Sequence, residues 1–149
     1  MDLFSIDHMP TVKSAMTPFP YYVLVSDPIT RAESLMAEHD VRHLPVRDGD
    51  ALVGVLAQLD LDHAVNPAVP KAERARVRVG SICRYQPYEV DADMPLVDVL
   101  DGMAERHIRS AIVVRGGKLV GIFSAIDACR ILAEALRRHF PSPGPDEVA

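Results

Sequence analysis

The chain has 149 residues, of which 48% are apolar and 25% charged, which is ordinary for a globular protein with one buried core. Its formal net charge of −5 argues against nonspecific nucleic-acid binding, which requires a basic surface that releases counterions from phosphates. No apolar run approaches the length that spans a bilayer, and the first residues lack a signal-peptide pattern, so we expect a cytoplasmic protein without membrane contact.

The first half of the chain is predicted to form a strand, a helix, two strands and a second helix. An extended run at residues 21–25 leads to Pro28, where a helix can start because proline's fixed φ and missing N–H cost nothing there. Two strands at residues 44–46 and 52–56 flank an Asp-Gly turn, which is typical of a hairpin. The apolar residues at helical spacing are Ile29, Ala32, Leu35 and Met36.

A linker follows at residues 67–78. Pro67 and Pro70 precede a short basic run, KAERARVR, between Lys71 and Arg78. Prolines next to a charge run are more typical of a solvated linker than of a nucleic-acid contact, and we interpret the run as a linker.

The second half of the chain repeats the order of the first. An extended run at residues 88–90 leads to Pro95, and strands at 111–114 and 119–123 flank a Gly-Gly turn. The apolar positions of its first helix are Leu96, Val99, Leu100 and Met103, and those of its second are Ile126, Cys129, Leu132, Ala133 and Leu136.

The two halves align without an insertion at a constant offset, 121 − 54 = 67, as shown by Gly54 and Gly121. GVLAQLD, which ends at Asp60, and GIFSAID, which ends at Asp127, are equivalent segments of this duplication. A unit of about 60 residues buries too little surface to be more than marginally stable alone, so we expect the two units to pack together. The predicted divisions are an N-terminal extension at 1–11, repeats at 12–66 and 79–138 joined by the linker, and a disordered tail at 139–149.

Metal and catalytic motifs are not found in the sequence. Cys83 and Cys129 lie far apart and outside any CxxC pattern, so we expect two buried thiols. The six histidines form no HxH pair, and no nucleophile elbow, phosphate-binding glycine loop or HExxH is present. We therefore expect neither a metal site nor an enzyme.

The segments VRHLPVRDGDALVGVLAQLD and HIRSAIVVRGGKLVGIFSAID, in this order and duplicated, resemble a tandem pair of CBS domains over residues 12–138. The resemblance implies an α+β fold in which two β-α-β-β-α repeats pack about a pseudo-twofold axis and leave two clefts. In many members these clefts bind AMP, ADP, ATP or S-adenosylmethionine. Members commonly dimerise through their helices and regulate another protein, and this chain resembles the stand-alone kind.

Asp127 is the residue that we expect to bind a ribose, since an ionised carboxylate accepts strong hydrogen bonds from both hydroxyls of a diol. Ser124, at the mouth of the following helix, is placed to bind ribose or phosphate, and Ile126 to cover the base. Ser-x-x-Asp is also a capping box, which needs no ligand. Both roles remain open, since one residue can cap and bind at once.

The resemblance implies that each cleft draws on both repeats. The residues that it adds to the Asp127 cleft are Thr17, Tyr22, Arg42, His43 and Arg109. The second cleft, at Asp60, is expected to be weaker because Ala57 replaces the serine and Glu89, equivalent to Tyr22, would disfavour a phosphate.

Two functional hypotheses follow. The first is a regulatory module that binds an adenosine-containing ligand and modulates its own dimer or an unidentified partner, with no required cofactor. The second is a ligand-free CBS module that serves for dimerisation or docking.

Overall fold

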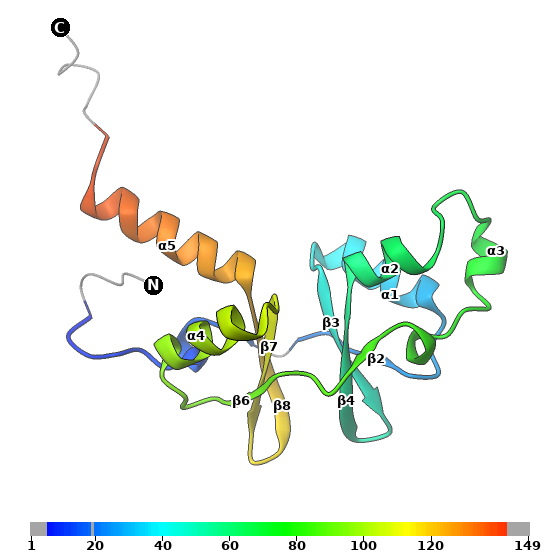
Figure 1. Ribbon diagram of the computed structural model, residues 1–149, viewed down its shortest axis with the longest axis horizontal. Coiled ribbons are helices and arrows are strands. Elements are labelled where there is room, and N and C mark those ends of the chain that lie inside the picture. Colours follow the sequence, from blue (N-terminus) through cyan, green and yellow to red (C-terminus); the bar gives the residue numbers. More distant parts are fainter. Residues whose placement is uncertain (1–5, 19, 143–149) are drawn as a thin grey trace, which may run out of the picture.

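The computed structural model describes residues 6–18 and 20–142. Part of the N-terminal extension and most of the predicted tail lie outside this range. The described chain forms two halves side by side, each with one sheet and its helices (Figure 1). This arrangement confirms the α+β fold of two repeats.

The first repeat forms the strands and helices in the predicted order. Pro28 is the N-cap of its first helix, and Asp40, in the left-handed region at φ 50°, ends it. The helix buries Ile29, Ala32 and Met36, so the apolar spacing identifies the covered side. The elements are β1 (Thr17–Pro18), β2 (Val23–Leu24), α1 (Ile29–His39), β3 (His43–Asp48), β4 (Ala51–Ala57) and α2 (Gln58–Ala64).

The second repeat follows the same plan with a longer final helix. Pro95 is the N-cap of its first helix, and His107, at φ 53°, ends it. The elements are β5 (Arg84–Tyr85), β6 (Glu89–Asp91), α4 (Leu96–Arg106), β7 (Ser110–Arg115), β8 (Lys118–Ser124) and α5 (Ala125–His139). In Figure 1, α5 extends well beyond the sheet from which it starts.

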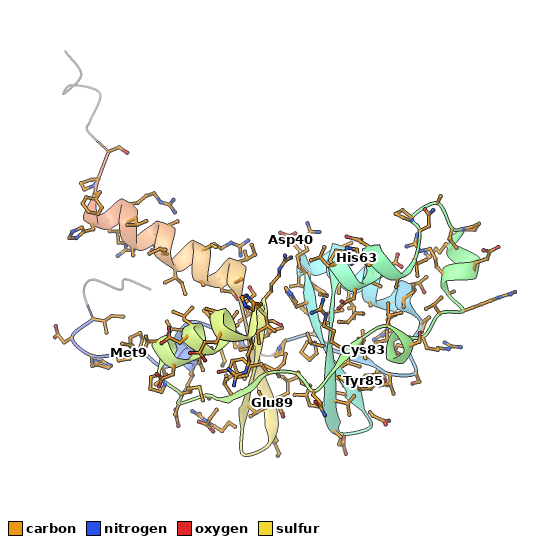
Figure 2. All side chains as sticks on the ribbon, in the orientation of Figure 1. Met9, Asp40, His63, Cys83, Tyr85 and Glu89 are labelled. Atoms are coloured by element: carbon orange, nitrogen blue, oxygen red, sulfur yellow. The ribbon has the colours of Figure 1, made fainter. Side chains whose placement is uncertain are left out.

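The repeats exchange their leading strands. One sheet has the order β1-β8-β7-β6 and the other β2-β3-β4-β5, so one edge strand of each sheet, β1 or β5, comes from the other repeat. Antiparallel pairing joins Thr17 to Ile122 and Arg84 to Val55. In Figure 2 the side chains of Cys83 and Tyr85 lie in the half that contains β3 and β4. Each half is therefore built from both repeats.

The cores show the same exchange. Val12, in a short 3-10 helix (Val12–Ser14), is fully buried in the cluster that contains Val99, Val113 and Phe123 of the second repeat. Val79, in the equivalent 3-10 helix (Val79–Ser81), is buried with the residues of the first repeat. Neither hydrophobic core is complete without a segment of the other repeat.

The linker is more ordered than a purely solvated segment. Residues Lys71–Arg74 form a short helix, α3, and Arg74 makes an ion pair with Glu33 of α1. The N–H of Ile29 donates to the carbonyl of Val77 at 3.0 Å. The basic run thus lies along α1, with its charges partly paired.

The two cysteines differ in burial. Cys83 is buried, as expected, and burial raises the pKa of its thiol, so it stays protonated at neutral pH. The prediction of a buried Cys129 is wrong, because that residue is exposed on α5, which extends past its sheet (Figure 1).

Candidate functional site

Asp127 and Ser124 form a complete capping box at the start of α5. The N–H and hydroxyl of Ser124 each donate to Oδ2 of Asp127 at 2.8 Å, and the Asp127 N–H donates to the serine Oγ at 3.2 Å. Among the residues that the structure describes, no donor contacts Oδ1 of Asp127. The capping role is therefore real, and it leaves one carboxylate oxygen available.

Asp60, at the start of α2, has both oxygens occupied. The Ala57 N–H donates to Oδ2 at 2.8 Å, and Nε of Arg84 donates to Oδ1 at 3.0 Å. Ala57 offers no hydroxyl in place of the serine. The two aspartates are equivalent in sequence, but their surroundings differ.

Two clefts lie beside the exchanged strands. The β1 cleft, of about 330 Å³, is lined by Thr17, Pro18, Pro20, Tyr21, His39, Val41, His43, Leu44 and Ile122. The β5 cleft, of about 310 Å³, is lined by His43, Val55, Ala57, Leu59, Arg84, Tyr85, Gln86, Pro87, Tyr88, His107, Ile108, Arg109 and Ser110. Seven residues that line the β5 cleft are equivalent, at the repeat offset of 67, to residues that line the β1 cleft. The two clefts are therefore related by the repeat.

A third space, the central cavity of about 440 Å³, lies where the two repeats meet. It is lined by Arg42, His43, Ala57, Gln58, Leu59, Asp62, Arg109, Ala125 and Ile126. Arg42 and Arg109 are equivalent in the two repeats, and neither has an ion-pair partner among the described residues. Two unpaired guanidinium groups beside the N-terminus of α5 favour an anion in this cavity.

His43 connects these three spaces, because it lines both clefts and the central cavity. Burial lowers the pKa of its imidazole, and Arg109 and Arg84 lower it further, although Asp60 and Asp127 act in the opposite direction. His43 is therefore mainly neutral at pH 7, and can accept as well as donate a hydrogen bond.

The remaining residues expected at the site fall into two groups. Thr17 lines the β1 cleft, and Ile126 borders the central cavity. Tyr22 lies elsewhere: the Arg47 guanidinium stacks over its ring at 4.7 Å from the centroid, and it lines a separate depression near α1. Glu89 is not among the described residues that line the β5 cleft. Figure 2 places Glu89 in the half that contains β6.

Two residues at the clefts were missed from sequence. Tyr21, not its neighbour, lines the β1 cleft, with its ring stacked on His39 at a centroid distance of 3.6 Å. Arg84 makes the ion pair with Asp60. Arg84 is equivalent in the repeat to Thr17, an expected cleft residue, so the alignment could have indicated that Arg84 also lies at a cleft. Only the exchange of strands shows that its side chain reaches Asp60.

Paired β-α-β-β-α repeats with exchanged edge strands define a tandem module with two clefts that are related by the repeat. Residues 12–66 and 79–134 match the CBS domain, and the chain belongs to the CBS domain family. CBS domains are in general regulatory modules rather than enzymes.

Similar proteins agree with this assignment. Hypoxic response protein 1 of Mycobacterium tuberculosis is 30% identical over 127 residues, which cover 85% of this chain and 87% of that protein. A putative acetoin utilization protein, AcuB, from Vibrio cholerae superposes with a TM-score of 0.74 at 25% identity, over 91% of this chain and all of that one. CBSX2, whose structure is a complex with AMP, gives 0.69 at 26% identity, over 83% and 97% of the two chains.

The described part of the chain contains neither a candidate membrane span nor a candidate metal cluster. None of its helices is both long and apolar enough to cross a bilayer. Residues 6–18 and 20–142 bring together no group of three His, Cys, Asp or Glu side chains that could hold a metal ion.

Proposed function

We propose that this chain is a regulatory sensor of an adenine nucleotide, AMP, ADP or ATP. The observation that carries the proposal is the pair of unpaired guanidinium groups, Arg42 and Arg109, on one central cavity. They favour an anionic phosphate and disfavour the cationic sulfonium of S-adenosylmethionine. The complex of the related CBSX2 with AMP supports the same class of ligand.

In this proposal the ribose binds at Asp127, through the Oδ1 that the capping box leaves available. Ser124 and the N-terminus of α5 assist there, and the phosphates extend into the central cavity. The β1 cleft, with Thr17 and the apolar surface of Ile122, receives the base. His43, between these spaces, is placed to hydrogen-bond either the ribose or a phosphate.

We also propose that α5 forms a homodimer interface. Its far half presents large apolar side chains to solvent, although Ala135 on the same half is buried. In Figure 1, α5 extends beyond the sheet from which it starts. The exposed apolar residues are Leu132, Leu136 and, just past the helix, Phe140. Nucleotide binding at the start of the same helix could thus alter the dimer, or the surface that an unidentified partner recognises. A cytoplasmic location, where adenine nucleotides are abundant, completes the proposal.

A thermal-shift panel with AMP, ADP, ATP, adenosine and S-adenosylmethionine tests the ligand. A nucleotide at 100 times its Kd stabilises the fold by about 2.7 kcal/mol, a rise of roughly 5 to 10 °C in Tm for a chain of this size. The Arg42→Gln/Arg109→Gln variant should respond to ATP no more than to adenosine. If millimolar nucleotides leave Tm unchanged, the sensor proposal fails and the ligand-free interaction module replaces it.

Light scattering coupled to size-exclusion chromatography tests the dimer. We expect wild-type protein to elute as a dimer and Leu132→Glu/Leu136→Glu as a folded monomer, since two charges would be desolvated at the interface. Lys118→Glu, on the exposed β7–β8 hairpin, is the control and should remain dimeric. A monomeric wild type, or a dimeric double variant, would contradict the assignment of α5.

A further inference from the structure

Arg84 forms an ion pair with Asp60, whose carboxylate is equivalent in the repeat to that of Asp127, the proposed ribose acceptor. Its Nε lies 3.0 Å from Oδ1 of Asp60, whose side chain is only 11% exposed, whereas that of Arg84 is 67% exposed. The Ala57 N–H holds the other oxygen at 2.8 Å. Asp60 is therefore a largely covered carboxylate with a donor on each oxygen, one of them cationic.

The fold explains why this contact forms in only one half of the molecule. Arg84 lies on β5, which pairs with β4 at Val55, and β4 leads directly into α2 and Asp60. Thr17 has the equivalent place on β1, beside β8 and the start of α5, but its side chain is too short to form such an ion pair. The strand exchange thus brings an arginine to one aspartate and a threonine to the other.

A ribose in the β5 cleft would have to replace the arginine. The bond from Arg84 to Asp60 is charge-assisted on both sides, whereas a diol offers only neutral donors to the same oxygen. Displacing the guanidinium would also leave it unpaired beside Arg109 and His107, which line the same cleft. The exchange is unfavourable for any ligand that recognises Asp60 through neutral hydroxyls.

We infer that Arg84 is an internal occupant of the β5 cleft that closes it to nucleosides, so that each chain binds a single nucleotide, at the Asp127 side. The inference rests on the proposed nucleotide function for the identity of the ligand. It goes beyond that function by naming the residue that sets the number of sites.

Isothermal titration calorimetry with AMP and with adenosine tests the inference. Wild-type protein should bind one equivalent, and Arg84→Thr, which installs the residue of the first repeat, should bind a second. Arg84→Thr/Asp60→Ala should return to one, because the second site needs the freed carboxylate. Arg115→Thr removes an exposed ion pair with Asp93 outside the clefts and is the matched control, with no change expected.

The outcomes separate this inference from the proposed function. If wild-type protein already binds two equivalents, or if folded Arg84→Thr gains none, the inference is wrong. Weaker AMP binding by Arg84→Thr with unchanged adenosine binding would also overturn it, by showing that Arg84 contacts phosphate. A wild type that binds no ligand refutes the nucleotide sensor, whereas a site gained in Arg84→Thr would still support the role of Arg84. Circular dichroism checks that every variant is folded.

Discussion

An Asp127→Ala variant is expected to bind AMP about 100-fold more weakly than wild-type protein. The carboxylate is proposed to accept hydrogen bonds from the ribose diol, and a bond to a charged group contributes about 1.5–3 kcal/mol. A loss of about 3 kcal/mol corresponds to roughly 100-fold in Kd. Isothermal titration calorimetry well below the melting transition measures this change.

The capping role of Asp127 requires a control, because the substitution also removes an acceptor for the Ser124 N–H and hydroxyl. Loss of such a cap costs about 1 kcal/mol of folding free energy. Asp60→Ala removes the equivalent contact to the Ala57 N–H and also the Arg84 ion pair, so it should destabilise the fold to a similar degree. Its AMP affinity should stay within about twofold of wild type, a change of under 0.5 kcal/mol. Equal losses in the two variants would refute a special role for Asp127.

Gly54→Ala is expected to destabilise the protein by about 1–3 kcal/mol, the usual range for overpacking a filled core. A Cβ on Gly54 would lie 2.6 Å from the backbone oxygen of Arg84 and 3.3 Å from its carbonyl carbon. Because these atoms belong to β5, the strand itself must move away from β4. Thermal unfolding should show a Tm lower by roughly 3 to 10 °C for a chain of this size.

Gly121→Ala is the matched control in the other half. The three atoms nearest to a Cβ there all belong to the side chain of Met16, including its Cγ at 2.9 Å and Cε at 3.0 Å. Methionine is flexible and can repack, so the loss should be about 1 kcal/mol or less. If Gly121→Ala is as damaging as Gly54→Ala, backbone contact with the exchanged strand is not the reason for glycine at position 54.

Much of the fold could be predicted from sequence because its signals are local or periodic. The offset of 67 residues between Gly54 and Gly121 predicted two similar units, and Pro28 and Pro95 marked both helix starts. Apolar residues at helical spacing identified the buried sides of α1 and α4. The capping box of Ser124 and Asp127 was visible as well, since both partners lie three residues apart.

The positions of individual cleft residues could not be predicted, since they depend on pairing between distant segments. Tyr21 and Tyr22 lie just before β2, outside any strand, so no strand alternation in the sequence indicates which of them lines the β1 cleft. The exposure of Cys129 depends on how far α5 extends past its sheet, which its apolar spacing does not reveal.

The sequence by itself determined that this chain is a duplicated CBS pair whose two aspartates are equivalent but whose neighbours, Ser124 and Ala57, differ. Only the tertiary structure decided that the repeats exchange β1 and β5, that Arg42 and Arg109 share one cavity, and that Arg84 forms an ion pair with Asp60. The reason is physical: turns, caps and helix faces arise from residues a few positions apart, whereas the ion pair of Arg84 joins residues 24 positions apart through a strand pairing that no local pattern encodes.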